Sequence, residues 1–128
     1  MAEFTDYLEN KILDHVLRND SYTSPTTCFV GLFTVAPTDT TSGTEVSGGS
    51  YARQELAVSA ASDGVVTSSA YINFPQATAN WGTISHIGIL DALTSGNLLM
   101  YTPLTTSKTI EEGDILKVSS GNLTVTLD

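Results

Sequence analysis

From residue 26 onward, short segments rich in strand-forming residues alternate with short turns, and this pattern limits the folds that the chain can adopt. Turn residues such as Asp63-Gly64 separate the segments. Strands are expected at 26–34, 51–59, 70–74, 83–90, 98–101, 115–119 and 123–127. About six to eight short antiparallel strands spaced roughly ten residues apart are typical of a β-sandwich or a small barrel. The sequence therefore predicts a mainly β (α+β) fold.

The first of these segments, 26–34, carries apolar side chains on both faces of the expected strand. Leu32 would face one side and Phe33 the other. A strand of this kind needs a cover on each face, so we expect it in the centre of a sheet. Residues 35–50 are rich in Gly, Pro and hydroxyl residues, so we expect a long loop there with no regular element. A loop of this length in a small domain is usually functional or mobile.

An amphipathic helix is expected before the strands. Apolar residues recur there at spacings of three and four: Phe4, Tyr7, Leu8, Ile12, Leu13, Val16 and Leu17. We expect one domain over residues 1–128, with the helix in 1–19 and the β part in 26–128. The apolar stripe is too costly to leave in water. We therefore expect the helix to pack mainly on its own domain, and loop 35–50 to provide more of the intermolecular contact.

The charge balance disfavours two classes of partner. The chain has 5 basic and 14 acidic residues, for a net charge of -9, and the basic residues are scattered. Binding to nucleic acid or to an anionic membrane needs clustered Lys and Arg, so we expect neither. The N-terminal residues lack the basic start and apolar run of a secretory signal, and no apolar stretch approaches the roughly 20 residues of a membrane span.

The residues for catalysis or metal binding are sparse. The chain has 2 His and 1 Cys, far apart, and it lacks the spacing of a zinc site, a calcium loop or a Gly-x-Ser-x-Gly nucleophile turn. Cys28 lies in an apolar run, where a small buried thiol is the simpler interpretation. We expect no catalytic residue, no metal ligand and no cofactor.

His86 and Asp91 are the pair that could still support catalysis, as part of a small hydrolase with a Ser or Thr nucleophile. In a regular strand residues 86 and 91 point to opposite faces, which weakens this hypothesis. A hydrogen-bonded His enclosed in the sheet, away from any hydroxyl nucleophile, is the expected alternative. We assign both residues, together with Phe74 and Trp81, as candidate fold anchors.

Several longer motifs resemble a family of short tailed-phage and prophage virion proteins that genomes label as tail fibre or decoration proteins. The motifs are Phe4 to His15, Val30 to Asp39 without Val35, Gly43 to Arg53, Phe74 to Ala92, and Gly96 to Leu99. The resemblance covers most of the chain. It implies a structural protein of the virion, made in the host cytoplasm, and not an enzyme.

Within this family the expected function is that of a capsid decoration or cement protein that binds and stabilises the head shell. The alternative is a tail or collar fibre-associated adaptor or receptor-binding protein. Expected partners are the major capsid protein or other virion proteins, and we expect a homo-oligomer, with a trimer as the first guess. The candidate intermolecular contacts are Thr38, Asp39, Glu45, Tyr51 and Arg53. Of these, Glu45 and Arg53 are opposite charges that flank a glycine turn and could pair to hold the loop closed, although an exposed pair would contribute only about 0–1 kcal/mol.

Overall fold

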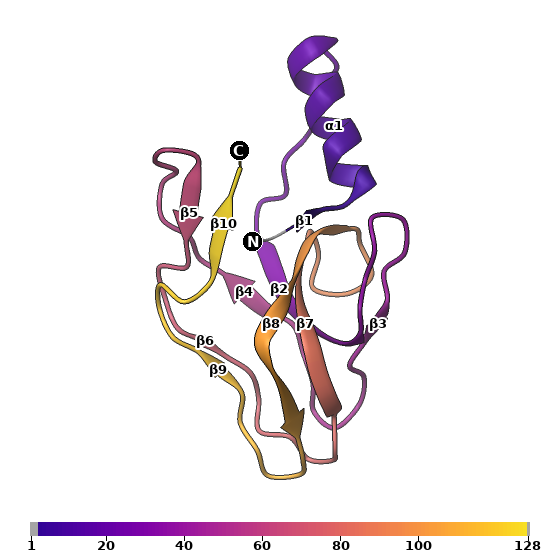
Figure 1. The fold of residues 1–128 in the computed structure, drawn as a ribbon, viewed down its shortest axis with the longest axis vertical. Helices are drawn as coiled ribbons and strands as arrows, with labels where there is room; N and C mark the ends of the chain where they lie inside the picture. Colours follow the sequence, from indigo (N-terminus) through magenta and orange to yellow (C-terminus); the bar gives the residue numbers. More distant parts are fainter. Residues whose placement is uncertain (1–2, 128) are drawn as a thin grey trace.

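The computed structural model describes residues 3–127 and has a mainly β fold with a helix near its N-terminus (Figure 1). The ends of the expected ranges 1–19 and 26–128, namely residues 1, 2 and 128, lie outside the described residues. The elements are β1 (Glu3–Phe4), α1 (Asp6–Leu17), β2 (Cys28–Val35), β3 (Thr44–Glu45), β4 (Gln54–Leu56), β5 (Val65–Thr67), β6 (Ile72–Asn73), β7 (Gly82–Leu90), β8 (Leu98–Ile110), β9 (Lys117–Val118) and β10 (Thr124–Thr126). The predicted fold class is confirmed.

The main sheet has six strands in the order β1-β8-β7-β2-β3, with β4 also paired to β2. Two short ladders, β5 with β10 and β6 with β9, complete the β structure, and all pairings are antiparallel. β2 lies between β7 on one side and β3 and β4 on the other. Its predicted central position is confirmed.

The core explains why β2 is apolar on both faces. Val30 and Leu32 are fully buried in a large cluster that also contains residues of the two short ladders and the segments that lead into them. Phe33, on the other face, belongs to a second cluster with Leu90, Leu98 and Tyr101. The two ladders therefore cover one face of the sheet. On the other face, side chains of the sheet itself pack against one another in the second cluster.

The pairing of β7 with β8 is irregular in the middle of the two strands. It shifts register between the pairs Ile84–Lys108 and His86–Pro103, where residues 104–107 of β8 lie opposite Ser85 alone, so the extra residues are on β8. Ile84 and Ile87 stand an odd number of residues apart, yet both lie in the large core cluster. The strict alternation of faces therefore does not hold along β7 at this irregularity.

Several predicted strand bounds are wrong. The predicted strand 51–59 shortens to β4, and the short strand β5 was not expected. The predicted strand 98–101 extends through Pro103 to Ile110. β1 covers only Met100 and Tyr101 of β8, so the rest of β8 is an edge where a proline removes no ladder bond. Its hydroxyl-rich second half gave no apolar alternation to recognise.

Loop 35–50 is also more regular than expected. β2 continues to Val35, and Thr44 and Glu45 form β3, which pairs back onto β2. The hydroxyl- and glycine-rich composition hid this short return strand because two residues are too few to show a period.

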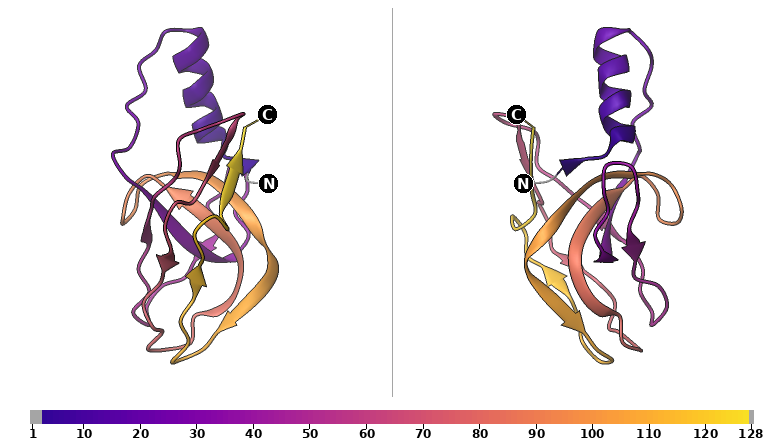
Figure 2. Two further views of the ribbon diagram at one scale, coloured as in Figure 1. Left: turned by 90° about the vertical axis from the view of Figure 1, so that its left-hand side faces the viewer. Right: turned by 45° about the vertical axis from the view of Figure 1, so that its right-hand side comes forward.

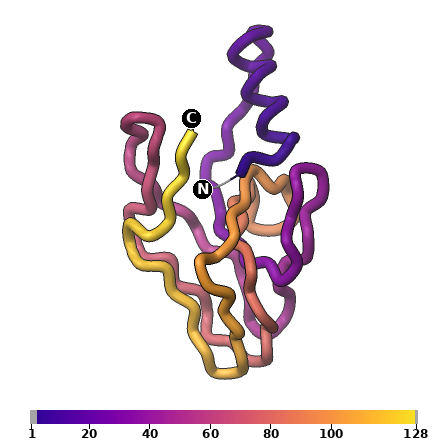
Figure 3. Tube along the Cα trace, in the orientation of Figure 1, coloured from indigo at the N-terminus to yellow at the C-terminus, as the bar shows by residue number. Residues whose placement is uncertain are grey.

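Only the first turn of the helix packs on its own domain, so the prediction that the helix packs mainly there is wrong. Figure 2 shows α1 standing away from the sheets, and Figure 3 shows the chain running back beside it toward β2. Of its apolar side chains only Leu8 is buried, whereas Leu13, Val16 and Leu17 are 54%, 67% and 75% exposed. We call α1 and the return segment 18–27 the arm, and these three side chains its apolar tip.

Candidate functional site

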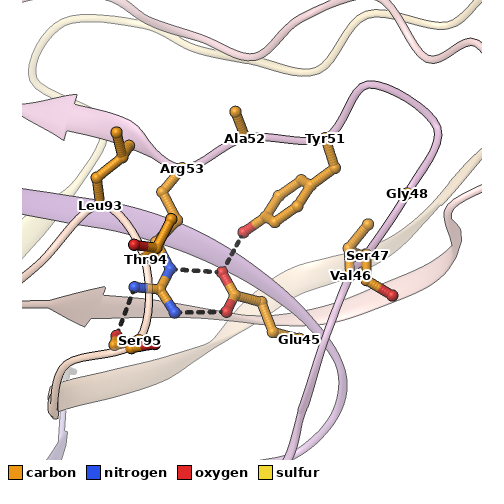
Figure 4. A pocket seen from close by; sticks show the side chains of 10 residues that line it. All are labelled: Glu45, Val46, Ser47, Gly48, Tyr51, Ala52, Arg53, Leu93, Thr94 and Ser95. Carbon is orange, nitrogen blue, oxygen red and sulfur yellow. Dashed lines mark hydrogen bonds and ion pairs between the residues drawn. The ribbon is translucent and has the colours of Figure 1, made fainter.

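The candidate contact residues Glu45, Tyr51 and Arg53 form one hydrogen-bonded cluster (Figure 4). Arg53 binds the Glu45 carboxylate through two nitrogens: Nε donates to Oε2 at 2.8 Å and Nη2 to Oε1 at 2.8 Å. The Tyr51 hydroxyl donates to Glu45 Oε2 at 2.6 Å and accepts from the Leu32 amide at 2.9 Å. The Arg53 and Glu45 side chains are only 10% and 22% exposed. Glu45 and Arg53 therefore do pair, and the small energy of an exposed pair does not apply to them, because the turn folds the pair against β2.

Arg53 also ties the cluster to the turn that follows β7. Its Nη1 donates to the carbonyl oxygens of Ala92 at 2.7 Å and Ser95 at 2.8 Å. The same turn is closed by Asp91, which accepts from the backbone and side-chain amides of Asn97. One guanidinium therefore joins loop 35–50 to turn 91–97.

The protonated forms of Arg53 and Tyr51 are both favoured. The hydrogen bonds to Glu45 raise the pKa of Arg53, although burial opposes them. Burial, and then the hydrogen bond to Glu45, raise the pKa of the Tyr51 hydroxyl well above its ordinary value. Arg53 therefore stays charged and Tyr51 stays neutral near pH 7.

A hollow of about 430 Å³ lies beside the cluster. Glu45, Tyr51 and Arg53 form one wall, and Leu93 and Thr94 form part of another (Figure 4). The polar groups of the first wall already bind each other, so the surface they leave for a partner is that of Leu93 and nearby hydroxyl groups. Leu93 is 53% exposed, and no sequence pattern singled it out.

Thr38 and Asp39 lie apart from this cluster, at the root of the arm. The Asp39 carboxylate accepts a 2.6 Å bond from the Tyr101 hydroxyl, which raises the pKa of Tyr101. The Asp39 carbonyl accepts from the Asp6 amide at 3.1 Å. Thr38 closes its own turn by accepting from the Thr41 amide at 3.0 Å. A second hollow of about 270 Å³ separates this turn from the start of the helix.

Thr5 fixes the arm to the sheet. Its hydroxyl donates to the Leu98 carbonyl at 2.7 Å and accepts from the Leu8 amide at 3.4 Å, so it caps the helix and anchors it at once. Its own amide donates to Leu99. Sequence reasoning missed this residue, although a Thr directly before an acidic first turn is a known start signal.

The aromatic fold anchors meet Tyr51 in the core. Trp81 is 6% exposed, and its Nε1 donates to the Gly49 carbonyl at 2.9 Å. The Tyr51 ring stacks on Phe74 at 6.2 Å and meets Trp81 edge-on at 5.4 Å between ring centroids. Tyr51 thus belongs both to the core and to the loop cluster.

His86 and Asp91 do not form a pair. Five residues of strand span about 16 Å, and Asp91 is bound to Asn97. His86 is half-buried rather than enclosed, and its Nδ1 lies 2.8 Å from the Ser85 hydroxyl. The expectation that it lies away from any hydroxyl is wrong, because the hydroxyl of the preceding residue is its hydrogen-bond partner. Among residues 3–127 no cluster of three His, Cys, Asp or Glu side chains comes together.

Comparison with known protein families shows to which family the chain belongs. The sequence profile of the family described as "Podophage GP4 fiber I protein gp80" matches residues 3–126. The chain belongs to this gp80 family. It is therefore a structural protein of a phage virion, and the resemblance to tailed-phage virion proteins is confirmed. No curated protein matches the chain. In the part of the chain that the structure describes, no helix is long and apolar enough to cross a membrane.

Proposed function

We propose that the protein is a fibre-associated component of a podophage virion, where it joins other virion proteins as an adaptor. The match of residues 3–126 to the gp80 fibre I family carries this proposal. A fibre shaft is normally built from repeats, and the sequence has no repeat of fixed period. An adaptor role therefore fits the chain better than a shaft role.

The arm supports an attachment role. Its apolar tip is exposed on a helix that stands clear of the sheets (Figure 2). Contiguous exposed apolar side chains mark interaction sites, and a short amphipathic helix typically docks in a groove of its partner. The partners we propose are other virion proteins and further copies of this chain.

Loop 35–50 and turn 91–97 form the second proposed contact surface. Glu45, Tyr51 and Arg53 hold this surface in shape, while Leu93 and Thr38 are available to a partner. If the protein sits at a fibre tip, this surface would contact the host receptor. Binding of the purified protein to host cells, abolished by Leu93→Asp, would support that version.

Capsid decoration remains the alternative location, with the major capsid protein as partner. Copy number separates the two: a decoration protein is present in roughly hundreds of copies, and a fibre component in about three to eighteen. We expect quantitative mass spectrometry of purified particles to give the low number, and gold-labelled antibodies to mark the tail. Labelling over the whole head would refute the fibre proposal, and absence from particles would refute both locations.

We further propose that the protein acts without catalysis. The Ser85–His86 contact is the feature that a hydrolase hypothesis would use. Hydrolysis of p-nitrophenyl acetate by the purified chain is expected to equal that of a His86→Gln variant. A rate that falls with this substitution would contradict the proposal.

A further inference from the structure

The β part of the chain has an apolar groove at the same end of the molecule as the arm. The groove encloses about 490 Å³ and is lined by residues 25–27 of the return segment, by the start of β2, by β4, and by one side chain from each of five other strands or links: Val58, Val66, Ile89, Met100 and Val125. Val58 is 45% exposed. A hollow in the range of roughly 300–1,000 Å³ can enclose several aliphatic side chains.

No residue of α1 lines this groove in the same copy, and the arm contributes only the end of its return segment, residues 25–27. Met100, which lines the groove, pairs with Phe4 at the root of the arm. The helix has 12 residues and therefore carries its tip about 18 Å from the root. Bending the tip back would break the Thr5 bonds that anchor and cap the helix. The chain thus holds an apolar tip and an apolar groove about one helix length apart.

We propose that the apolar tip of one copy, Leu13, Val16 and Leu17, docks in the groove of a second copy. One charge at each surface is complementary to the other. Glu55 is the one charged residue among the described residues that line the groove, and Arg18 directly follows the tip with a 74% exposed side chain, held only by a long 3.5 Å contact to Asp14. Copies with a net charge of -9 repel each other, so a contact between them needs such local complementarity.

The amount of surface also favours exchange between copies over simple pairing of two tips. A stable interface needs about 800 Å² from each partner, and three side chains fall well short of this area. When every copy gives an arm to one groove and receives an arm in its own, each copy makes the contact twice. Reciprocal exchange gives a dimer, and head-to-tail exchange gives a closed ring.

This inference deepens the proposed function, because it assigns the homotypic contact of a protein proposed to work as an oligomer. Cys28 lines the groove and is the only cysteine of the chain, so it serves as a natural probe. In full-length Leu17→Cys protein, mild oxidation with copper phenanthroline should link subunits through residues 17 and 28. The matched controls are Leu17→Cys with Cys28→Ser, and Ile115→Cys, a comparably exposed site beside β9.

The expected result is disulfide-linked oligomers on a non-reducing gel for the first variant and monomers for both controls. An intramolecular disulfide would show that the arm binds its own groove, and links that persist without Cys28 would show pairing of tips. Linking of the Ile115 variant to the same extent would show that the disulfides form by random collision. The absence of any linked product would show that the tip does not bind in the groove. Each of these results overturns the proposal.

Charge reversal gives an independent test in solution. Sedimentation should show that Arg18→Glu and Glu55→Arg each dissociate the oligomer, with circular dichroism unchanged, and that the double variant reassociates. A wild-type chain that is monomeric at high concentration, or a double variant that stays dissociated, refutes the exchange. Presence in purified particles is measured separately, so failure of the contact and failure of the virion role are distinguishable.

Discussion

Arg53→Gln should destabilise the fold far more than removal of a surface charge. The substitution removes both bonds to Glu45 and the bonds to the carbonyls of Ala92 and Ser95. Removing one partner of a buried ion pair costs about 3–5 kcal/mol. Glu45 keeps its bond to Tyr51 and is 22% exposed, so water offsets part of this loss. We therefore expect a loss at the lower end of this range, about 3 kcal/mol in the free energy of unfolding.

Urea unfolding followed by circular dichroism measures this loss. A loss of this size should lower the urea midpoint by about 1.5 M and the melting temperature by roughly 10 °C. Arg18→Gln is the matched control, since the Arg18–Asp14 pair is long, at 3.5 Å, and exposed. Its loss should cost at most about 0.5 kcal/mol. If both variants lose the same small amount, the Glu45–Arg53 pair is an ordinary surface pair and the argument from burial fails.

Three further substitutions test the core and the cluster. Because the pKa of Tyr51 is raised in the native state, its contribution to the free energy of unfolding is fully present below pH 10 and falls above it. Above pH 10 unfolded tyrosine ionises near its ordinary value of 10, while native Tyr51 stays protonated. The loss is about 1.4 kcal/mol per pH unit for this residue, so urea titrations from about pH 8 to 11 should show a shallower decline for Tyr51→Phe; an unchanged slope would rule out this origin. Gly88→Ala should cost about 1–3 kcal/mol in the same assay, because its Cβ would lie 2.5 Å from Phe33 Cε1, and a neutral result would mean that the sheet can open there. Trp81→Phe should cost about 1 kcal/mol by thermal unfolding, because the Gly49 carbonyl loses the indole donor and keeps only the Thr78 amide; a loss below about 0.5 kcal/mol would show that this bond is dispensable.

The features that the sequence predicted correctly are those that depend on local alternation. The two-sided apolar pattern of 26–34 placed β2 in the centre of the sheet, and the spacing of apolar residues located the helix. The same spacing could not say what covers the stripe, because a period describes one surface and carries no information about its partner. The sequence around Leu17 is the same whether this side chain is buried within its own chain or against another subunit.

The candidate site was predictable only in part, for a related reason. Glu45 and Arg53 are eight residues apart across a glycine turn, and their proximity follows from local geometry. The bonds from Arg53 to Ala92 and Ser95 span 39 and 42 residues, and only the assembled sheet brings these segments together. The register shift between β7 and β8 interrupts the alternation of β7 near Ser85, so the parity of residue numbers fails as a guide to its faces.

The single threonine at the root of the arm gives the helix the mechanics of a lever. Thr5 holds the helix at one end, while the side chains that need a partner lie about 18 Å away at the other. A rotation of about 10° at this pivot would displace the tip by about 3 Å, which is more than the tolerance of close apolar packing. The angle between neighbouring subunits would then depend on the Thr5 hydroxyl together with the backbone bonds of Thr5 and Asp6 at the same pivot, so a change as small as Thr5→Val would alter the geometry of an assembly while leaving every contact residue in place.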